Sequence, residues 1–233
     1  MAETTIHQQL KALYADDEAG QEVQLNGYRI DAIVGDRLIE IQCAGLSAIR
    51  DKIQDLVQTR KVVVVKPLCE KKTLLKKSRK GGKVVSKRKS PLSENYYDIF
   101  DELVHFTNAF PHRNLTLEIL MTEQEEVRLP PVRKGRRRRM RQRVEDRRLV
   151  AVTGKLVLKT NSDLLKMLPD DLPKPFTTAD VAAGTEIPRW LAQKMAYCLK
   201  HSGAIKQVGK QGNAILYAQV KRRGRRKAAP RAA

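Results

Sequence analysis

The chain has 233 residues, a length that allows one domain of about 120 to 150 residues and a smaller one. Hydrophobic residues make up 41% of the chain and charged residues 31%, which is typical of a globular protein rather than of a disordered polymer. Aromatic residues make up only 5%, so a wide stacking surface for single-stranded nucleic acid is not expected.

The net charge of +20 is concentrated in three basic runs. Residues 67–95, 133–150 and 221–233 carry net charges of +8, +8 and +7, and the segments between them are acidic or only weakly basic. Such runs usually neutralise the phosphates of a nucleic acid. Solvated tails that only confer solubility are the alternative. An anionic membrane is a weaker candidate, because no basic run carries an apolar helical face.

Cysteine usage and hydropathy favour a cytoplasmic protein without a membrane partner. The three cysteines, Cys43, Cys69 and Cys198, are odd in number and show no CxxC spacing, which disfavours a disulfide framework or a zinc site. The first residues, MAETTIHQQL, do not resemble a signal peptide. No apolar run approaches the ~18 residues needed to span a bilayer.

The first part of the chain predicts a mixed sheet with helices on its faces. Turn signals at Asn26-Gly27 and Gly35-Asp36 separate three short apolar runs, which predicts a meander. A helix and then the run VVVV follow, and a strand reached through a helix implies a crossover. The predicted elements are a helix over 3–14, strands over 21–25, 28–34 and 37–43, a helix over 46–60 and a strand over 61–68.

A basic insertion over about 69–95 interrupts this domain. We interpret it as a flexible β-ribbon in which TLLKK and KVVSK flank a Gly-Gly turn, with a disordered loop as the alternative. A helix over 96–110 and a strand over 114–121 follow, and the domain is expected to end at residue 131. Residues 132–148, which include RKGRRRRMRQR, are expected to form a basic linker.

Residues 149–220 predict a smaller domain, and 221–233 a basic disordered tail. Helices are expected over 162–168, from 177 and from 188 to 201, with strands over 205–208 and 214–220. The text FTTADVAAGTEIPRWLAQKMAYCLKHSGAIKQVGKQGNAILYAQV therefore resembles a winged helix-turn-helix domain. A winged helix used for protein contacts is the alternative.

The winged-helix resemblance implies that the third helix enters the major groove of DNA and that the hairpin contacts its backbone. The basic linker is expected to contact phosphates. The candidate DNA-binding residues are Thr185, Arg189, Gln193 and Lys194 around the third helix, Lys206, Lys210 and Gln211 in the hairpin, and Arg136, Arg137, Arg138 and Arg139 in the linker.

Two carboxylates lie on adjacent predicted strands in GYRIDAIVGDRLIEIQCAG. A short turn brings Asp31 and Glu40 across from each other, and Gln42 shares a face with Glu40. Two carboxylates form a hard-oxygen site suited to Mg²⁺, and the Ile41 carbonyl is a further candidate ligand. A polar sheet face is the plainer interpretation. However, buried carboxylates without a cation cost several kcal/mol, and these two stand among apolar residues.

This layout resembles the PD-(D/E)XK nuclease superfamily, which has the restriction-endonuclease-like fold. The resemblance covers residues 1–68, with 96–121 as accessory structure. It implies that Asp31 is the first acid and Glu40 the second, in an acid-x-lysine triplet whose lysine is replaced by Gln42.

Three further residues complete the candidate site. The family's first helix often supplies an acid, for which Glu3 is the best match and Glu22 on the first strand the other option. Lys52, on the helix after the motif, is the candidate that replaces the missing lysine. The proline of the family name is absent, and Ile30 occupies its place. The four histidines show no ligand spacing.

The predicted fold class is therefore α/β: a restriction-endonuclease-like mixed sheet with flanking helices over 1–131 and a small C-terminal winged helix domain. The resemblance implies a metal-dependent DNA endonuclease of restriction or repair type, with Mg²⁺ or Mn²⁺ as cofactor and duplex or branched DNA as partner. A homodimer is compatible with this class. The alternatives are a non-catalytic DNA-binding regulator or architectural protein with a degenerate nuclease fold and, less favoured, an RNA-associated protein.

Overall fold

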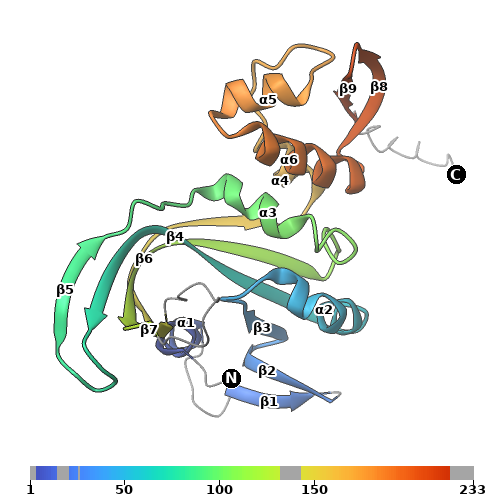
Figure 1. The fold of residues 1–233 in the computed structure, drawn as a ribbon. Coiled ribbons are helices and arrows are strands. Elements are labelled where there is room, and N and C mark those ends of the chain that lie inside the picture. Colours follow the sequence, from blue (N-terminus) through green and yellow to red (C-terminus); the bar gives the residue numbers. More distant parts are fainter. Residues whose placement is uncertain (1–3, 15–20, 26, 132–142, 221–233) are drawn as a thin grey trace, which may run out of the picture.

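A computed structural model describes residues 4–14, 21–25, 27–131 and 143–220 of the chain (Figure 1). It consists of a large mixed sheet flanked by helices and a smaller C-terminal part in which helices pack beside a two-stranded sheet. Within the described residues, no helix is long and apolar enough to cross a membrane.

The first half of the sheet has the predicted order of elements. Strands β1, β2 and β3 pair antiparallel, and β4 lies parallel to β3, reached through a 3-10 turn and helix α2. The predicted helix, meander, helix and buried strand are thus confirmed. Their bounds are α1 (Thr5–Tyr14), β1 (Gln21–Leu25), β2 (Tyr28–Val34), β3 (Arg37–Ile41), η2 (Leu46–Ile49), α2 (Arg50–Leu56) and β4 (Lys61–Lys77).

The basic insertion forms strands, so the ribbon interpretation is confirmed over the disordered loop. Strand β4 continues to Lys77, and β5 (Val84–Lys89) pairs antiparallel with its second half. On its other side β4 pairs parallel with β6 (Leu115–Leu129), so the ribbon is part of a wider sheet. The sheet order is β1-β2-β3-β4-β6-β7, with β5 beside β4.

The predicted boundary of the first domain is wrong, and so is part of the predicted linker 132–148. Strand β7 (Arg143–Leu158) pairs with β6 along its length, from Leu129 opposite Arg143 to Leu117 opposite Leu158. An arginine-rich segment can form this strand because β6 offers it acidic partners. Arg147 binds Glu126 of β6 at 3.1 Å. The sheet therefore extends to residue 158, and residues 132–142 lie outside the described part.

The helix predicted over 96–110 is shorter than expected. Asn95 caps the 3-10 turn η3 (Tyr96–Asp98), which leads into α3 (Ile99–Leu103). Beyond Leu103 the chain continues in turns, yet Phe106 and Phe110 remain buried. The apolar residues that suggested a longer helix are thus buried by turns instead, and these turns keep both rings in the core.

The C-terminal part follows the predicted order of helix, helix, helix and hairpin. Thr160 and Thr177 are the N-caps of the first two helices, and each forms a reciprocal capping box with an aspartate three residues later. With Thr160 as its cap, the first of these helices begins at Asn161, one residue before the predicted start. The elements are α4 (Asn161–Leu165), α5 (Thr178–Thr185), α6 (Arg189–His201), β8 (Ile205–Gln211) and β9 (Ala214–Gln219).

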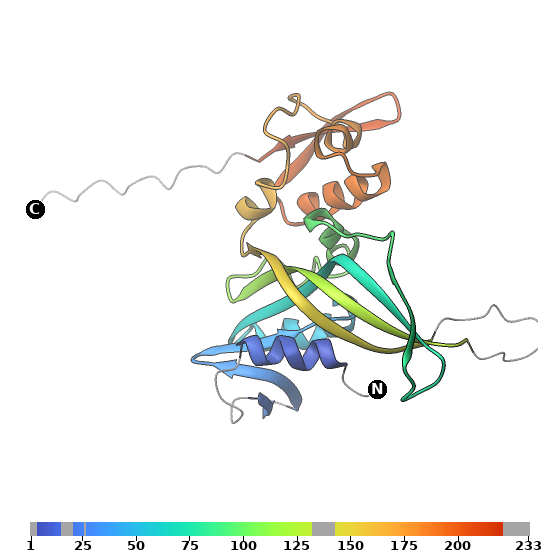
Figure 2. The same ribbon diagram turned by 90° about the vertical axis from the view of Figure 1, so that its left-hand side faces the viewer.

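The two faces of the sheet are covered by different elements (Figures 1 and 2). Helix α1 covers one face, where Ile6 and Leu10 pack with Ile39 and Val63. The opposite face carries α2, α3 and the C-terminal part, whose side chains join one continuous core that includes Phe106 and Met195. Helix α6 packs against α3, so the two parts share a core.

Because one core joins the two parts, we expect unfolding in urea as a single transition. The fluorescence of Trp190, the single tryptophan, reports on α6, whereas far-UV circular dichroism reports on the whole chain. Phe106→Ala, in the sheet part, should lower the free energy of unfolding by about 3–5 kcal/mol and shift both curves equally. The exposed control Leu13→Ala should change it by less than about 0.5 kcal/mol. Separate midpoints for the two probes would contradict a shared core.

Candidate functional site

The two predicted acids lie at the point where β2 and β3 stop pairing. Ala32 is paired with Ile39, and this is the last pair of the register. One residue further, Asp31 stands opposite Glu40. There the Asp31 side chain accepts a hydrogen bond from the Ile41 backbone N–H at 2.7 Å. A carboxylate thus replaces a strand partner at the end of the β2–β3 pairing.

Glu40 is a buried carboxylate that Lys52 contacts on one side only. The Lys52 Nζ donates to Glu40 Oε1 at 2.6 Å and also to the Arg29 carbonyl. The other oxygen, Glu40 Oε2, is buried and has no hydrogen-bond partner among the described residues. Burial, followed by the charge of Asp31, raises the pKa of Glu40 to about 7, although Lys52 acts in the opposite direction.

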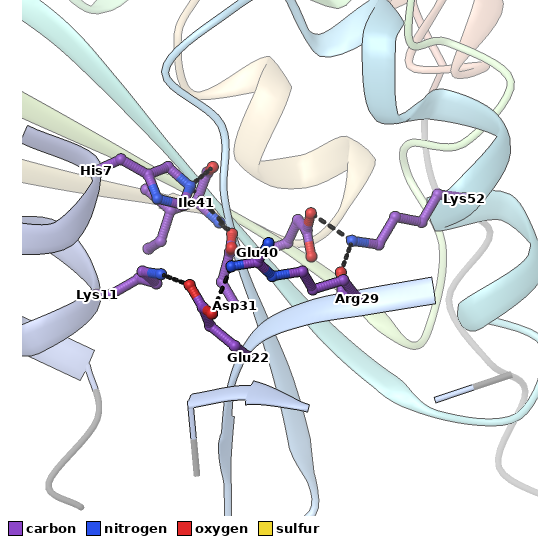
Figure 3. Close-up of polar contacts among 8 residues, drawn as sticks. All are labelled: His7, Lys11, Glu22, Arg29, Asp31, Glu40, Ile41 and Lys52. Carbon is purple, nitrogen blue, oxygen red and sulfur yellow. Dashed lines mark hydrogen bonds and ion pairs between the residues drawn. The ribbon is translucent and has the colours of Figure 1, made fainter. Parts of the chain in front are cut away.

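Asp31 is held ionised by groups on α1 and β3 (Figure 3). His7 Nε2 lies 2.9 Å from the Ile41 carbonyl oxygen and 3.3 Å from Asp31 Oδ2. A carbonyl oxygen only accepts, so this nitrogen carries the hydrogen. Burial would raise the pKa of Asp31, but the hydrogen bonds from His7 and from the Ile41 N–H outweigh it and lower that pKa. The two neighbouring acids therefore have pKa values driven apart, which is characteristic of functional carboxylate pairs.

Glu22 is a third acid beside this pair, but it is bound to cations of its own (Figure 3). It lies on β1 with a positive φ of 55°. Lys11 Nζ contacts it at 2.8 Å, and Arg29 binds its second oxygen. These hydrogen bonds, that from Lys11 first, lower the pKa of Glu22 to about 2. Glu22 is thus ionised and occupied, and Glu3 lies outside the described residues.

The remaining predicted site residues lie nearby with different partners. Lys52 is brought to Glu40 as expected from its place on the following helix. The Gln42 side chain donates to the Gly45 carbonyl at 2.6 Å, so it fixes the turn after β3. The Ile41 carbonyl, expected as a metal ligand, accepts from His7.

Sequence reasoning missed His7, Lys11 and Arg29. His7 and Lys11 are four residues apart on α1, which places them on one face of that helix. Lys11 is only 3% exposed, and a buried lysine requires an anionic partner. An i, i+4 pair of basic residues beside the apolar stripe of α1 was therefore the available signal. Its target on the sheet depended on how α1 packs.

The residues at the site fit a hard divalent cation. Carboxylate oxygens are the ligands Mg²⁺ prefers, and this ion is commonly bound by one or two carboxylates together with substrate phosphates. Asp31 and Glu40 supply two carboxylates, and Glu40 Oε2 is a buried oxygen that lacks a partner. Within the described residues, no group of three or more His, Cys, Asp or Glu side chains is arranged so that it could hold a metal ion by itself.

The predicted DNA-binding residues of α6 differ in whether they contact another helix. Arg189 and Gln193 are exposed, and Arg189 donates to the Thr178 hydroxyl at 3.3 Å. Lys194 instead forms an ion pair with Asp101 of α3 and lies over the Trp190 ring.

The other predicted DNA contacts differ in exposure and in whether the structure describes them. The Thr185 hydroxyl donates to the Val181 carbonyl within α5. Lys206, Lys210 and Gln211 are exposed on β8. The arginines 136–139 lie outside the described residues.

The chain belongs to a family that is defined by its sheet part. The model of the family described as "Domain of unknown function (DUF8091)" matches residues 4–159, which coincides with α1 to the end of β7. The chain is also 28% identical over 217 residues to an "Uncharacterized protein" of Treponema pallidum (strain Nichols), covering 92% of this chain and 84% of that protein. No solved structure matches.

Glu40 gives this site a pH-dependent stability. The folded state keeps the Glu40 proton up to a pKa of about 7, above the ordinary value of 4.5, so it binds more protons than the unfolded state in this window. The free energy of unfolding of the wild type should therefore fall as the pH rises through this window. Glu40→Gln does not titrate. The free energy of unfolding of this variant minus that of the wild type should therefore increase by on the order of 2–3 kcal/mol from about pH 5 to about pH 8.

The matched control is Asp36→Asn, at the turn of the same hairpin. The hydrogen bond from Lys61 lowers the pKa of Asp36, so Asp36 is ionised in the folded and the unfolded state throughout this range. Urea unfolding at several pH values should show no trend for this control. A constant difference between Glu40→Gln and wild type would contradict the raised pKa of Glu40.

Proposed function

We propose that this protein is a metal-dependent DNA endonuclease of restriction or repair type. The observation that carries the proposal is the pair of carboxylates, Asp31 and Glu40, at the end of the β2–β3 pairing, with Glu40 Oε2 buried and without a partner. A buried anion of this kind is costly unless a cation compensates it. A divalent cation is the compensating ligand that two carboxylates suit best.

The order of elements supports a PD-(D/E)XK-like fold for the sheet part. Helix, three antiparallel strands, helix and parallel strand follow one another from α1 to β4. The two acids occupy the second and third of these strands, where the nuclease resemblance requires them.

The side chains around the pair have separate roles in phosphodiester hydrolysis. A divalent cation would supply Lewis-acid activation of the phosphate and of a water molecule. Asp31 and Glu40 would hold that cation, and His7 orients Asp31 through its contact at 3.3 Å. Lys52 contributes a positive charge beside Glu40 that stabilises the developing phosphorane charge, as the missing lysine of the triplet would.

The C-terminal part is the proposed docking module. Its order of three helices and a hairpin is that of a winged helix, and Arg189 and Gln193 are exposed on its third helix. Lys206 and Lys210 are exposed on the hairpin and suit contact with phosphates. In this arrangement the docked duplex contacts the solvent-facing side of α6.

A non-catalytic DNA-binding protein is the second candidate, and one observation favours it. His7 contacts Asp31, and Lys52 contacts Glu40, so each acid already has a basic neighbour within the chain. A degenerate nuclease site could be stabilised in this way without a metal. Cleavage assays separate the two candidates.

Asp31→Asn should abolish Mg²⁺-dependent nicking of supercoiled plasmid while preserving DNA binding. The variant keeps the shape of the side chain and removes one of the two carboxylates needed for the cation. Nicking by wild type and variant is compared with Mg²⁺ and with Mn²⁺. DNA binding is measured in parallel by gel shift in EDTA.

Asp36→Asn is the matched control, since it makes the same chemical change in the same hairpin at an exposed carboxylate that binds Lys61. It should cleave as wild type does. If wild type cuts no DNA form with either metal, or if Asp31→Asn cuts equally well, the endonuclease proposal fails and the non-catalytic binder replaces it.

Arg189→Ala and Gln193→Ala should reduce discrimination between DNA sites by about 1–3 kcal/mol if either side chain contacts a base edge. Lys210→Ala should instead weaken binding to every sequence alike, because its expected target is the backbone. Selection of preferred sites from a random library, followed by affinity measurements, provides the comparison. An equal loss on all sequences for all three variants would mean that this part is a non-specific anchor.

A further inference from the structure

A cationic hollow lies where β5, β4 and β6 run side by side. Its volume is about 180 Å³. Three of its lining residues are basic and none is acidic. The lining residues are Leu74, Lys76, Ser86, Arg88 and Arg128.

The strand register concentrates these charges. Lys76 of β4 is paired with Ser86 of β5 on one side and with Arg128 of β6 on the other. Arg88 is paired with Leu74, two residues before Lys76. Lys76 and Arg128 thus place two positive charges on neighbouring strand positions, and like charges so placed repel each other. An anion bound between them would remove the repulsion.

Three other lysines of β4 and β5 each have an acidic partner. Lys71 binds Glu123 at 2.7 Å, Lys77 binds Glu145 at 2.9 Å, and Lys87 lies 3.5 Å from Glu125. In the part of the chain that the structure describes, Lys76 and Arg88 form no ion pair. These neighbouring lysines are thus neutralised within the chain, whereas Lys76 and Arg88 remain available to a ligand.

Arg128 lines the hollow and also forms an ion pair within the protein. It contacts Glu126, which is 2% exposed and which Arg147 also binds. This pairing fixes the Arg128 guanidinium at the wall of the hollow, so one donor is oriented before any ligand arrives. Preorganised guanidinium donors favour phosphate, whose oxygens accept several hydrogen bonds at once.

We propose that this hollow binds a backbone phosphate of duplex DNA, through Lys76, Arg88 and Arg128 with the Ser86 hydroxyl. The choice of DNA as the source of the phosphate rests on the proposed function. Exposed basic residues continue past the hollow around the turn and along β5, where they suit the neighbouring phosphates of a polyanion rather than one small ion. These residues are Arg79, Lys80, Lys83 and Lys89.

The test is K76Q/R88Q, which removes two basic side chains and keeps polar ones of similar length. Arg128 stays, because its loss would leave the buried Glu126 with fewer partners. Binding of a short labelled duplex is measured by fluorescence anisotropy in EDTA over a range of KCl concentrations. We expect an affinity about tenfold lower and a log–log salt slope shallower by about 1, since the hollow holds one phosphate and each neutralised phosphate contributes about 0.9.

K71Q/K87Q is the matched control, because it removes the same formal charge from the same strands at lysines that have glutamate partners. It should change affinity and slope much less. Equal losses in both double variants would mean that net charge alone acts, and unchanged binding in K76Q/R88Q would remove the site. The same titration is run with a duplex RNA of equal length, and a loss confined to the RNA would overturn the assignment to DNA. Since no cleavage is involved, failure of the endonuclease proposal in the nicking assay leaves this result independent.

Discussion

Two carboxylates held side by side in a mostly apolar sheet are the constraint to which the surrounding structure responds. Asp31 and Glu40 repel each other and are poorly solvated, so each requires a nearby hydrogen-bond donor or positive group. Helix α1 provides His7 on one side, and α2 provides Lys52 on the other. The helices that sandwich the first strands therefore have an electrostatic role besides packing. The spare oxygen of Glu40 shows where this compensation is incomplete.

The sequence predicted the elements that local chemistry controls. Turn residues such as Asn26-Gly27 and Gly35-Asp36 separate the strands of the meander, and the run VVVV marks the buried strand β4. The opposition of Asp31 and Glu40 followed from the short turn between them, and Lys52 was found from its helix. These features depend on a few neighbouring residues, so periodicity and turn chemistry were sufficient.

Long-range packing set what the sequence did not predict. The arginine-rich start of β7 has the composition of a linker, and it forms a strand because Glu126 on β6 offers Arg147 a partner 21 residues away. His7 reaches the site only because Ile6 and Leu10 dock α1 on the sheet. Lys194 has the spacing of a DNA-facing residue, yet it binds Asp101 on α3, a helix that is distant in the sequence and adjacent in space. In each case the deciding partner lies far away in the sequence.

The continuous core between α3 and α6 has a geometric consequence for any enzyme built in this way. Helix α6 is fixed to the sheet by packing and by the Lys194–Asp101 ion pair. A module joined to a cutting domain by a flexible linker can lie at a range of distances from it. A module that shares a core with the cutting domain stays at one distance from it. For an endonuclease of this architecture, the number of base pairs between the sequence read and the bond broken would be a constant of the fold.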